Sequence, residues 1–335
     1  MDFKRQYDER LMDIIANGVS NEGKEVRTVW KDGEPAYTKA VWVRQFRVRP
    51  EDPFPLLYKK FVNPKSFTSE ILWIMQKASN VVQDARDLGT KVWDEWENEE
   101  GTIGKAYGYQ IRNNRFVVEV DKVSEKARKA MGRDIVKYGE GKKGDYLQQF
   151  EDGKVVVKLT QIDYVIHQLI DNPYSRQTMT TIYNPKEHHE MELPPCVWTS
   201  HWEVMADGKL YLAVTARSSD TFLGLPFNVA QYSLLHRLIA HVTGYEIGDF
   251  VLTTDDSHLY DRHIPIALEY LEREEPEIDV EFWIDGEVES FRDFEYEINF
   301  GWKGYSKEEV KPLAAPIAIG LRELERLREE EKQKK

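Results

Sequence analysis

Apolar residues recur along the chain at two different spacings, and the change between them marks its central connection. In the run LYLAVTA, residues 210–216, apolar side chains alternate with their neighbours, which predicts a strand. In the run VAQYSLLHRLIAHVTG, residues 229–244, they return every three or four positions, which predicts a helix that Gly244 ends. The segment RSSDTFLGLPFN, residues 217–228, joins the two and puts Asn228 at the expected N-cap.

The same two spacings predict further elements earlier in the chain. Residues 1–20 have a charged amphipathic pattern that predicts a short helix. The run VWVRQFRVR, residues 41–49, alternates and predicts a strand. From Ser66, the run SFTSEILWIMQKA combines a Ser/Thr start with an apolar face and predicts another helix. Strands and helices that alternate in this way indicate an α/β protein.

Two segments are dominated by charged residues instead. Residues 113–155, rich in Lys, Glu and Gly, predict an exposed insertion, because the run GEGKKG at 139–144 lacks the strand and helix that a dinucleotide-binding fingerprint requires. Residues 320–335 predict a solvated helical tail. We therefore expect a single domain over residues 1–319, followed by this tail.

Composition limits the classes of partner. With 335 residues, 41% of them hydrophobic, the chain can bury a substantial core. The net charge of -13 argues against DNA or RNA as a partner, because phosphate backbones select clustered Lys and Arg. No apolar run reaches the ~18 residues of a membrane span, and the N-terminus does not read as a signal peptide. The single cysteine excludes an intrachain disulfide and fits a reducing cytoplasm.

The connecting segment carries candidate binding chemistry. Arg217 stands at the end of the predicted strand, a Gly-Leu-Pro turn follows, and the amide of Asn228 comes next. An arginine and a helix start together suit a small anionic ligand. On the local pattern alone an ordinary strand–turn–helix connection is favoured, and the ligand-binding interpretation stays open beside it.

Cys196, in the run LPPC, is the candidate nucleophile. A lone cysteine is usually a small buried hydrophobic residue. A catalytic cysteine reacts as the thiolate, which a thiol of ordinary pKa hardly forms at neutral pH. Positive neighbours are therefore required, and Arg217 and Arg176 are the candidates.

Together these segments resemble the thymidylate synthase family, whose enzymes attach a one-carbon unit to C5 of a pyrimidine nucleotide. RSSDTFLGLPFN resembles the family's phosphate- and base-binding segment, and LPPC resembles its nucleophile segment. Further matching segments follow in the family's order: FPLLYKK (54–60), SEILW (69–73), WDEW (93–96), GKAYGYQ (104–110), DNPYSR (171–176), DDSHLYDRH (255–263) and APIAI (315–319). The resemblance implies an α/β (α+β), thymidylate synthase-like fold whose large mixed sheet forms a homodimer interface, with helices on the other face.

The resemblance also implies roles for individual residues. Those implied for catalysis are Cys196, Glu70, Tyr107, Asn228 and Asp220. Those implied for nucleotide binding are Arg217, Ser218, Arg176, Asn228, His258 and Tyr260. Those implied for folate binding are Trp93, Asp220, Leu193, Gly224 and Phe227. The implied co-substrate is 5,10-methylenetetrahydrofolate, and no metal is expected, because His188 and His189 lack partners at zinc spacing.

Within this scheme the Cys196 thiolate adds to C6 of the pyrimidine, Glu70 orders water near the ring, and Tyr107 takes part in the proton relay at C5. Pattern alone offers plainer roles: Glu70 as a solvated or capping carboxylate, Trp93 as a core residue and Asp220 as a turn cap.

Phosphate binding involves the second subunit and a mobile loop. In the family, the arginine at the position of Arg176 reaches across from the other subunit, which implies a homodimer. The family usually has a second arginine beside it, where this chain has Gln177. A loop arginine is also expected between residues 21 and 49, where Arg27, Lys31 and Arg44 all remain candidates.

Asn228 indicates the base. Its amide offers one donor and one acceptor, which suit the O4 acceptor and the N3–H donor of uracil, whereas cytosine presents the opposite pattern. Family members that act on deoxycytidylate have an acidic residue at this position. We therefore expect deoxyuridylate (dUMP) as the substrate.

Three departures from the family pattern concern the product. Val197 follows the nucleophile where synthases usually have His, Ala216 precedes the phosphate arginine where they usually have Gln, and residues beyond Ile319 leave it no free carboxylate to close over the folate. The first two resemble the hydroxymethylase branch, best known from phages, and favour 5-hydroxymethyl-dUMP as the product in a host cytoplasm. A methylating thymidylate synthase is the alternative, and a non-catalytic nucleotide-binding subunit is a more remote one.

Overall fold

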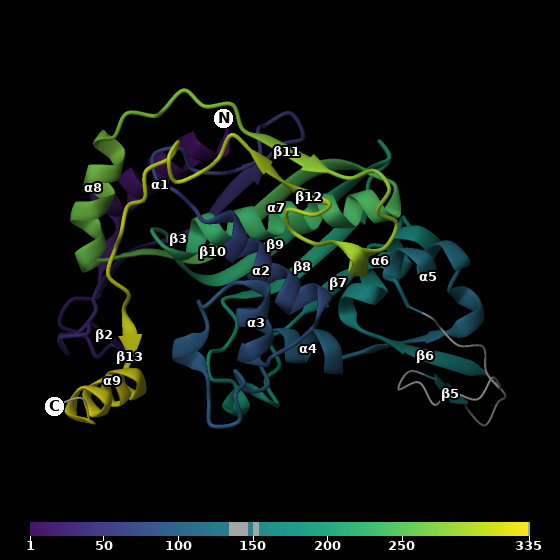
Figure 1. The fold of residues 1–335 in the computed structure, drawn as a ribbon, viewed down its shortest axis with the longest axis horizontal. Helices are drawn as coiled ribbons and strands as arrows, with labels where there is room; N and C mark the ends of the chain where they lie inside the picture. Colours follow the sequence, from purple (N-terminus) through teal and green to yellow (C-terminus); the bar gives the residue numbers. More distant parts are fainter. Residues whose placement is uncertain (134–146, 150–153, 334–335) are drawn as a thin grey trace.

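The structure, a computed structural model, describes residues 1–133, 147–149 and 154–333. A mixed six-stranded sheet forms the centre of this part of the chain (Figure 1). The strand order is β1-β3-β10-β9-β8-β7, and only β9 and β10 run parallel. These strands are β1 (Val19–Ser20), β3 (Thr38–Val48), β7 (Met179–Thr181), β8 (Val197–Val204), β9 (Lys209–Asp220) and β10 (Glu246–Tyr260). The expected mixed sheet and α/β fold are confirmed.

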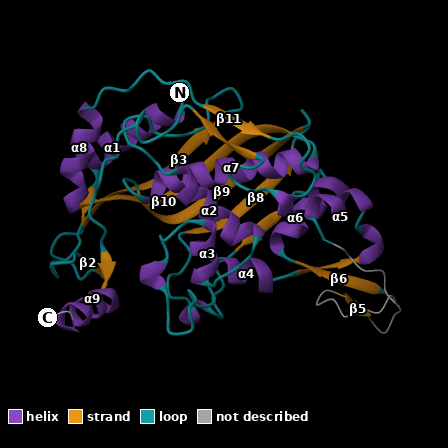
Figure 2. Ribbon diagram, viewed as in Figure 1, coloured by secondary structure: helices purple, strands orange, loops and turns teal. Residues whose placement is uncertain are grey.

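The parallel pair requires a crossover, which α7 (Gly224–Thr243) provides across the face of the sheet. Leu212 and Val214 of β9 and Leu252 of β10 are buried on this face. Phe46 of β3 pairs with Leu252, so it points the same way, and α1 (Phe3–Asn17) packs on it through Phe3. The helices thus cover one face of the sheet (Figure 2).

The opposite face is polar and partly exposed. Gln45, Thr253 and Thr215 stand side by side across β3, β10 and β9, and Ala213 is exposed. Trp42 on β3 keeps 71% of its surface exposed. No helix among the described residues packs on this face in Figure 2.

The remaining helices, turns and small sheets surround this core. The helical segments are α2 (Pro64–Ile71), the π-helix η1 (Leu72–Gln76), α3 (Val82–Leu88), η2 (Asp94–Trp96), α4 (Gly108–Asn113), η3 (Val120–Lys122), α5 (Glu125–Met131), α6 (Gln161–Asp171), η4 (His188–Glu190), η5 (Asp261–His263), α8 (Ile264–Glu272) and η6 (Phe291–Asp293). One small sheet pairs β11 (Glu281–Ile284) with β12 (Phe300–Lys303). Among the described residues, no helix is both long and apolar enough to cross a membrane.

The described part of the predicted insertion supplies two strands of a three-stranded sheet, and the third strand begins at the last residue of the insertion. The order in this sheet is β4-β6-β5, with β4 (Phe116–Glu119), β6 (Val155–Leu159) and β5 (Leu147–Gln149). The GEGKKG run, which we expected to form an exposed loop, lies outside the described residues.

The expected helices are confirmed near residues 1–20 and 66–78, but one boundary prediction was wrong. Helix α7 begins at Gly224, so Asn228 lies inside the helix rather than at its N-cap. Pro226 allows this, because its fixed φ and missing N–H suit a first helical turn. Asn228 is therefore free of a capping role.

The C-terminal tail forms the expected helix, α9 (Leu321–Gln333), but one side of it is covered. Strand β13 (Ile319–Gly320) pairs with β2 (Thr28–Val29), and Leu324 packs with Val29 and Ile319 in a small apolar cluster. The tail thus holds the loop that contains Arg27.

Replacing Leu324 with Asp should release this loop. A charge inside the cluster, added to the loss of a buried leucine worth about 2–5 kcal/mol, would detach α9 from β2. We expect hydrogen exchange at the amides of Thr28 and Val29 to accelerate at least about tenfold by mass spectrometry. The exposed Glu325→Ala on the same helix is the control, and unchanged exchange in L324D would contradict the assignment.

Candidate active site

Cys196 lies immediately before β8, at the edge of the sheet where the parallel strands β9 and β10 end. Arg217 fixes its position from β9. The backbone N–H of Arg217 donates to the carbonyl oxygen of Cys196 at 2.9 Å. The guanidinium donates through Nε to the carbonyl of Pro195 at 3.0 Å and through Nη2 to that of Pro194 at 2.8 Å. The predicted phosphate arginine therefore also shapes the turn that presents the thiol.

The electrostatic field at Cys196 has opposing contributions. Burial raises the pKa of the thiol above its usual value, and the positive charges of Arg217 and Arg27, with a hydrogen bond to Tyr107, act against this rise. Two positive neighbours were expected, and within this chain they are Arg217 and Arg27.

Arg176 lies elsewhere. It is exposed ahead of β7, which pairs with β8 so that Met179 faces His201, and it lines a surface hollow with Glu203 and Met205. Cys196 precedes the opposite end of β8, and a strand of this length spans about 25 Å. Arg176 therefore does not reach the thiol of its own chain, and its action on a second subunit stays a prediction.

The structure separates the three candidates for the loop arginine. The charge of Arg27 lowers the pKa of both Cys196 and Tyr260. The charge of Lys31 lowers the pKa of Glu95, and Arg44 forms a salt bridge with Asp13 at 2.9 Å.

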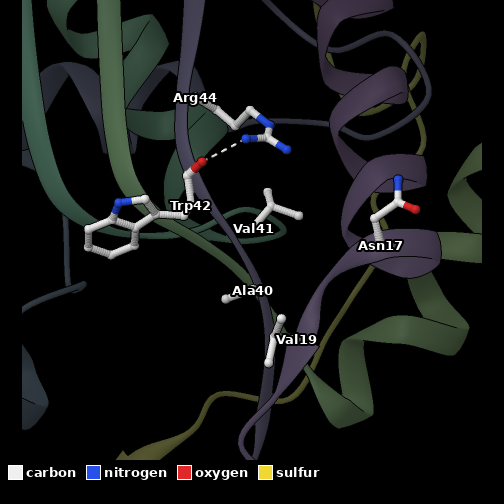
Figure 3. A pocket seen from close by; sticks show the side chains of 6 residues that line it. All are labelled: Asn17, Val19, Ala40, Val41, Trp42 and Arg44. Atoms are coloured by element: carbon white, nitrogen blue, oxygen red, sulfur yellow. Dashed lines mark hydrogen bonds between the residues drawn. The ribbon is translucent and has the colours of Figure 1, made fainter.

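Figure 3 shows where Arg44 points. Its Nη1 donates to the carbonyl oxygen of Trp42 at 2.6 Å, at a hollow of about 450 Å³ between the end of α1 and β3. Apart from Arg44 itself, none of the predicted site residues lines this hollow. Of the three candidates, Arg27 is the one whose charge influences Cys196 and Tyr260, and its contact with a phosphate stays a prediction.

Tyr107 forms a hydrogen bond with the backbone of Cys196. Its Oη accepts the N–H of Cys196 at 3.1 Å, and burial, followed by the charge of Cys196, raises the pKa of the phenol well above its usual value. The backbone of Tyr107 has φ 44°, a region that costs a non-glycine residue free energy. At the next residue, a side chain on Gly108 would come within 2.0 Å of the carbonyl oxygen of Ser79. This close approach requires glycine and locks Tyr107 in place.

Glu70 on α2 points inward, as the resemblance implied, and is neither a capping residue nor freely solvated. Its Oε1 accepts the indole N–H of Trp93 at 3.0 Å, and its Oε2 accepts Nε2–H of Gln231 at 2.7 Å. Burial raises the pKa of the carboxyl to about 7, although both hydrogen bonds lower it. A group with such a pKa can exchange protons near neutral pH.

Gln231 is a site residue that the sequence analysis missed. Its Oε1 accepts a hydrogen bond from Nδ2 of Asn228 at 3.3 Å, so it joins Asn228 to Glu70. The two residues are three positions apart on α7 and therefore share a face. That spacing was the available signal, but it is visible only once Asn228 is known to be helical.

The other predicted nucleotide-binding residues meet at the ends of β9 and β10. The strand register sets Ser218 beside Asp256 and Asp220 beside His258. His258 Nδ1 lies 2.6 Å from Asp256 Oδ1, and its ring meets that of Tyr260 edge-on at 5.3 Å. Burial raises the pKa of the Tyr260 phenol to about 12, so it remains a donor at neutral pH.

Asp220 caps the turn after β9, the plainer of its two expected roles. Its Oδ1 accepts the N–H groups of Phe222 and Leu223 at 2.9 and 3.1 Å. Burial would raise the pKa of this carboxyl, but the neighbouring His263, whose Nδ1 lies 3.7 Å from Oδ1, and the charge of His258 outweigh it, so the pKa is lowered. The turn-capping role leaves the implied folate contact as a prediction.

The residues implied for folate binding differ in exposure. Trp93 is only 5% exposed. Its ring packs edge-on against Tyr107 at 4.9 Å, and its indole N–H donates to Glu70. Leu193, Gly224 and Phe227 are half-buried, and the last two lie at the start of α7, where Gly224 is close to Asp220. These apolar surfaces beside a carboxylate fit a flat ring that carries N–H donors.

No group of three or more His, Cys, Asp or Glu side chains that could hold a metal ion occurs in the described part of the chain.

Comparison with known proteins gives consistent matches. The sequence model of the family described as thymidylate synthase matches residues 5–319. Thymidylate synthase 1 of Bacillus subtilis (strain 168) is 41% identical over 293 residues, which cover 87% of this chain and 91% of that protein. Thymidylate synthase of Bacillus phage phi3T is 40% identical over the same shares. The solved structure of thermostable thymidylate synthase A from Bacillus subtilis superposes with a TM-score of 0.77, at 38% identity, over 95% of this chain and 100% of that one.

The raised pKa of Glu70 predicts a pH-dependent stability. The folded chain holds this proton up to about pH 7, whereas the usual pKa is 4.5, so the stabilisation is complete below pH 4.5 and is lost as the pH rises through 7. The stability difference between the wild type and Glu70→Gln should therefore shift against the wild type by about 3 kcal/mol over this window. Denaturant unfolding at several pH values measures it, with the exposed Glu99→Gln as control. Parallel curves for wild type and E70Q would contradict the buried, proton-holding carboxyl.

Proposed function

Because this chain belongs to the thymidylate synthase family, we propose that it converts dUMP to dTMP. The observation that carries the proposal is the meeting of the thiol of Cys196 with Tyr107, Arg217 and Arg27 at one edge of the sheet. A nucleophile, a buried hydroxyl and two nearby positive charges are what attack on an anionic nucleotide requires. The relatives are themselves named thymidylate synthases.

The first step uses the thiolate of Cys196. Its sulfur forms a bond to C6 of the uracil ring while the electrons of the C5–C6 double bond move to C5 and O4. C5 then attacks the methylene carbon of the folate, and loss of the C5 proton with release of tetrahydrofolate leaves a methylene group on C5. Hydride from tetrahydrofolate reduces this methylene to the methyl group while the C5–C6 double bond forms again and the Cys196 thiolate leaves C6, giving dTMP and dihydrofolate. The co-substrate of thymidylate synthases, 5,10-methylenetetrahydrofolate, supplies this unit together with the hydride that completes the methyl group, and no metal is needed.

The charged groups divide the binding of dUMP between them. Arg217, with Nη1 outside the contacts to the proline carbonyls, and Ser218 would bind the phosphate, and Arg27 would close on it from the β2 loop. His258 and Tyr260 would hold the ribose hydroxyl. Glu70, held by Trp93, would order water and move protons near the ring.

A homodimer completes the site in this proposal. The uncovered sheet face, with the exposed Trp42 and Ala213, is available to a second copy. Arg176 would then reach the phosphate of the partner's site. A cytoplasmic location is part of the same proposal.

The sequence and the structure favour different products. The sequence favours 5-hydroxymethyl-dUMP, because Val197, Ala216 and the tail depart from the family pattern. Val197 and Ala216 are neighbours across β8 and β9, and they are only 4% and 0% exposed. Two buried apolar side chains give water no polar partner, so they favour a dry site and hydride transfer.

The tail does not open the site either. Ile319 pairs with Val29 through the backbone, so the segment is held although the chain continues. These features, with the names of the relatives, favour the methyl product over the hydroxymethyl product.

Product analysis tests this choice. Incubation with dUMP and 5,10-methylenetetrahydrofolate should yield dTMP by mass spectrometry, with stoichiometric dihydrofolate. 5-Hydroxymethyl-dUMP with tetrahydrofolate would reverse the product assignment. The absence of any denaturation-resistant adduct with 5-fluoro-dUMP and the folate would instead favour a non-catalytic subunit.

Replacing Arg27 with Ala should weaken dUMP binding. Loss of one charge-assisted contact to phosphate corresponds to about 1.5–3 kcal/mol, or about a 10- to 100-fold rise in KM for dUMP. Steady-state kinetics measures the change. Arg44→Ala, which removes an arginine of the same region directed at Asp13, should leave this KM unaltered, and an equal rise in both variants would refute the role of Arg27.

A further inference from the structure

The side chains between the base-reading amide and the buried carboxyl form a hydrogen-bond chain with a definite direction. Above its pKa of about 7 the Glu70 carboxylate can only accept, so Gln231 turns its NH₂ group toward it. The carbonyl oxygen of Gln231 then faces Asn228 and must receive the NH₂ of that residue. Glu70 thus sets the orientation of the Gln231 amide, and Gln231 in turn sets the orientation of the Asn228 amide.

We propose that Gln231 is a positioning residue that sets the base specificity of the site by fixing the amide orientation of Asn228. This inference rests on the proposed function, in which Asn228 reads the base. Because one N–H of the Asn228 amide donates to Gln231, the other N–H and the carbonyl oxygen remain for the base. In this fixed orientation they pair with O4 and N3–H of uracil. A reversed amide would present the opposite order, which suits cytosine.

The position of Gln231 supports a single orientation. It is only 3% exposed, and its donor distance to Glu70, 2.7 Å, is that of a bond to a charged group. Burial removes water as an alternative partner for Gln231, so a flip of its amide would leave a buried N–H or carbonyl unpaired. The local side chains therefore hold Asn228 without any contact to the ligand.

The amide orientations depend on the ionisation of Glu70. The groups that face this carboxyl are Trp93 and Gln231 as donors, with Tyr107 from the start of α4 and Tyr232 from α7 as titratable neighbours. Tyr107 and Tyr232 both have pKa values raised by burial, so neither carries charge near neutral pH. A change at Gln231 therefore acts on Glu70 through the lost donor.

Two substitutions separate positioning from mere packing. Gln231→Leu removes both hydrogen bonds at similar volume and should relax the preference for dUMP over dCMP about tenfold above pH 7, where Glu70 is ionised. Gln231→Glu keeps the shape but can donate to Glu70 only when protonated, and two adjacent carboxyls share a proton at the lower pH. In this variant the preference should persist at low pH and disappear as the pH rises.

Calorimetric dissociation constants for dUMP and dCMP, without folate, measure the preference independently of catalysis. Gln76→Leu is the matched control, because Gln76 is a half-buried glutamine whose amide donates to the carbonyls of Phe291 and Phe294, away from Asn228. It should lower stability and leave the ratio of the two constants unchanged.

The outcomes are distinguishable. A wild-type ratio retained in Q231L, or a pH-independent ratio in Q231E, would overturn the positioning role and leave the proposed function intact. A wild type without any preference for dUMP would overturn the proposed function itself.

Discussion

The parallel pairing of β9 and β10 is the constraint on which the rest of the structure depends. A parallel pair cannot be closed by a hairpin, so the chain must cross the sheet, and α7 does so as an almost completely buried helix. Each large apolar side chain that it buries contributes about 1.5–3 kcal/mol. Parallel strands also end at the same edge, so Asp220 and Tyr260 are neighbours there, beside the first turn of α7.

That edge gathers the polar groups that an apolar core would exclude. Glu70 is buried with a raised pKa, Tyr107 has a strained backbone, and Cys196 is held in a desolvated turn. Each of these features costs free energy, and the packing of α7 and the sheet offsets the cost. The same groups are those that nucleophilic attack and proton transfer need, so the strain lies where the chemistry is proposed.

The segments that close the site come from the two ends of the chain. Strand β2 directly follows Arg27 and is held by β13 and α9 through Val29, Ile319 and Leu324. Backbone pairing with β2 fixes Ile319 although the chain continues beyond it. The departures in sequence at Val197, Ala216 and the tail are thus compatible with a closed, dry site.

The sequence alone was enough to predict the alternation of strands and helices, the family, the lone cysteine Cys196 and the segment from Arg217 to Asn228, because these depend on local spacing and on residue types within one stretch. The tertiary structure was needed to show that the charge of Arg27, rather than that of Lys31 or Arg44, influences Cys196, because this depends on how the loop folds back toward the sheet. It also placed Asn228 inside α7 and Gln231 against Glu70, since a helix start and a buried contact between residues 70 and 231 have no local signature. The product assignment changed for the same reason: whether Val197 and Ala216 admit water depends on burial across two strands, which residue identity alone does not specify.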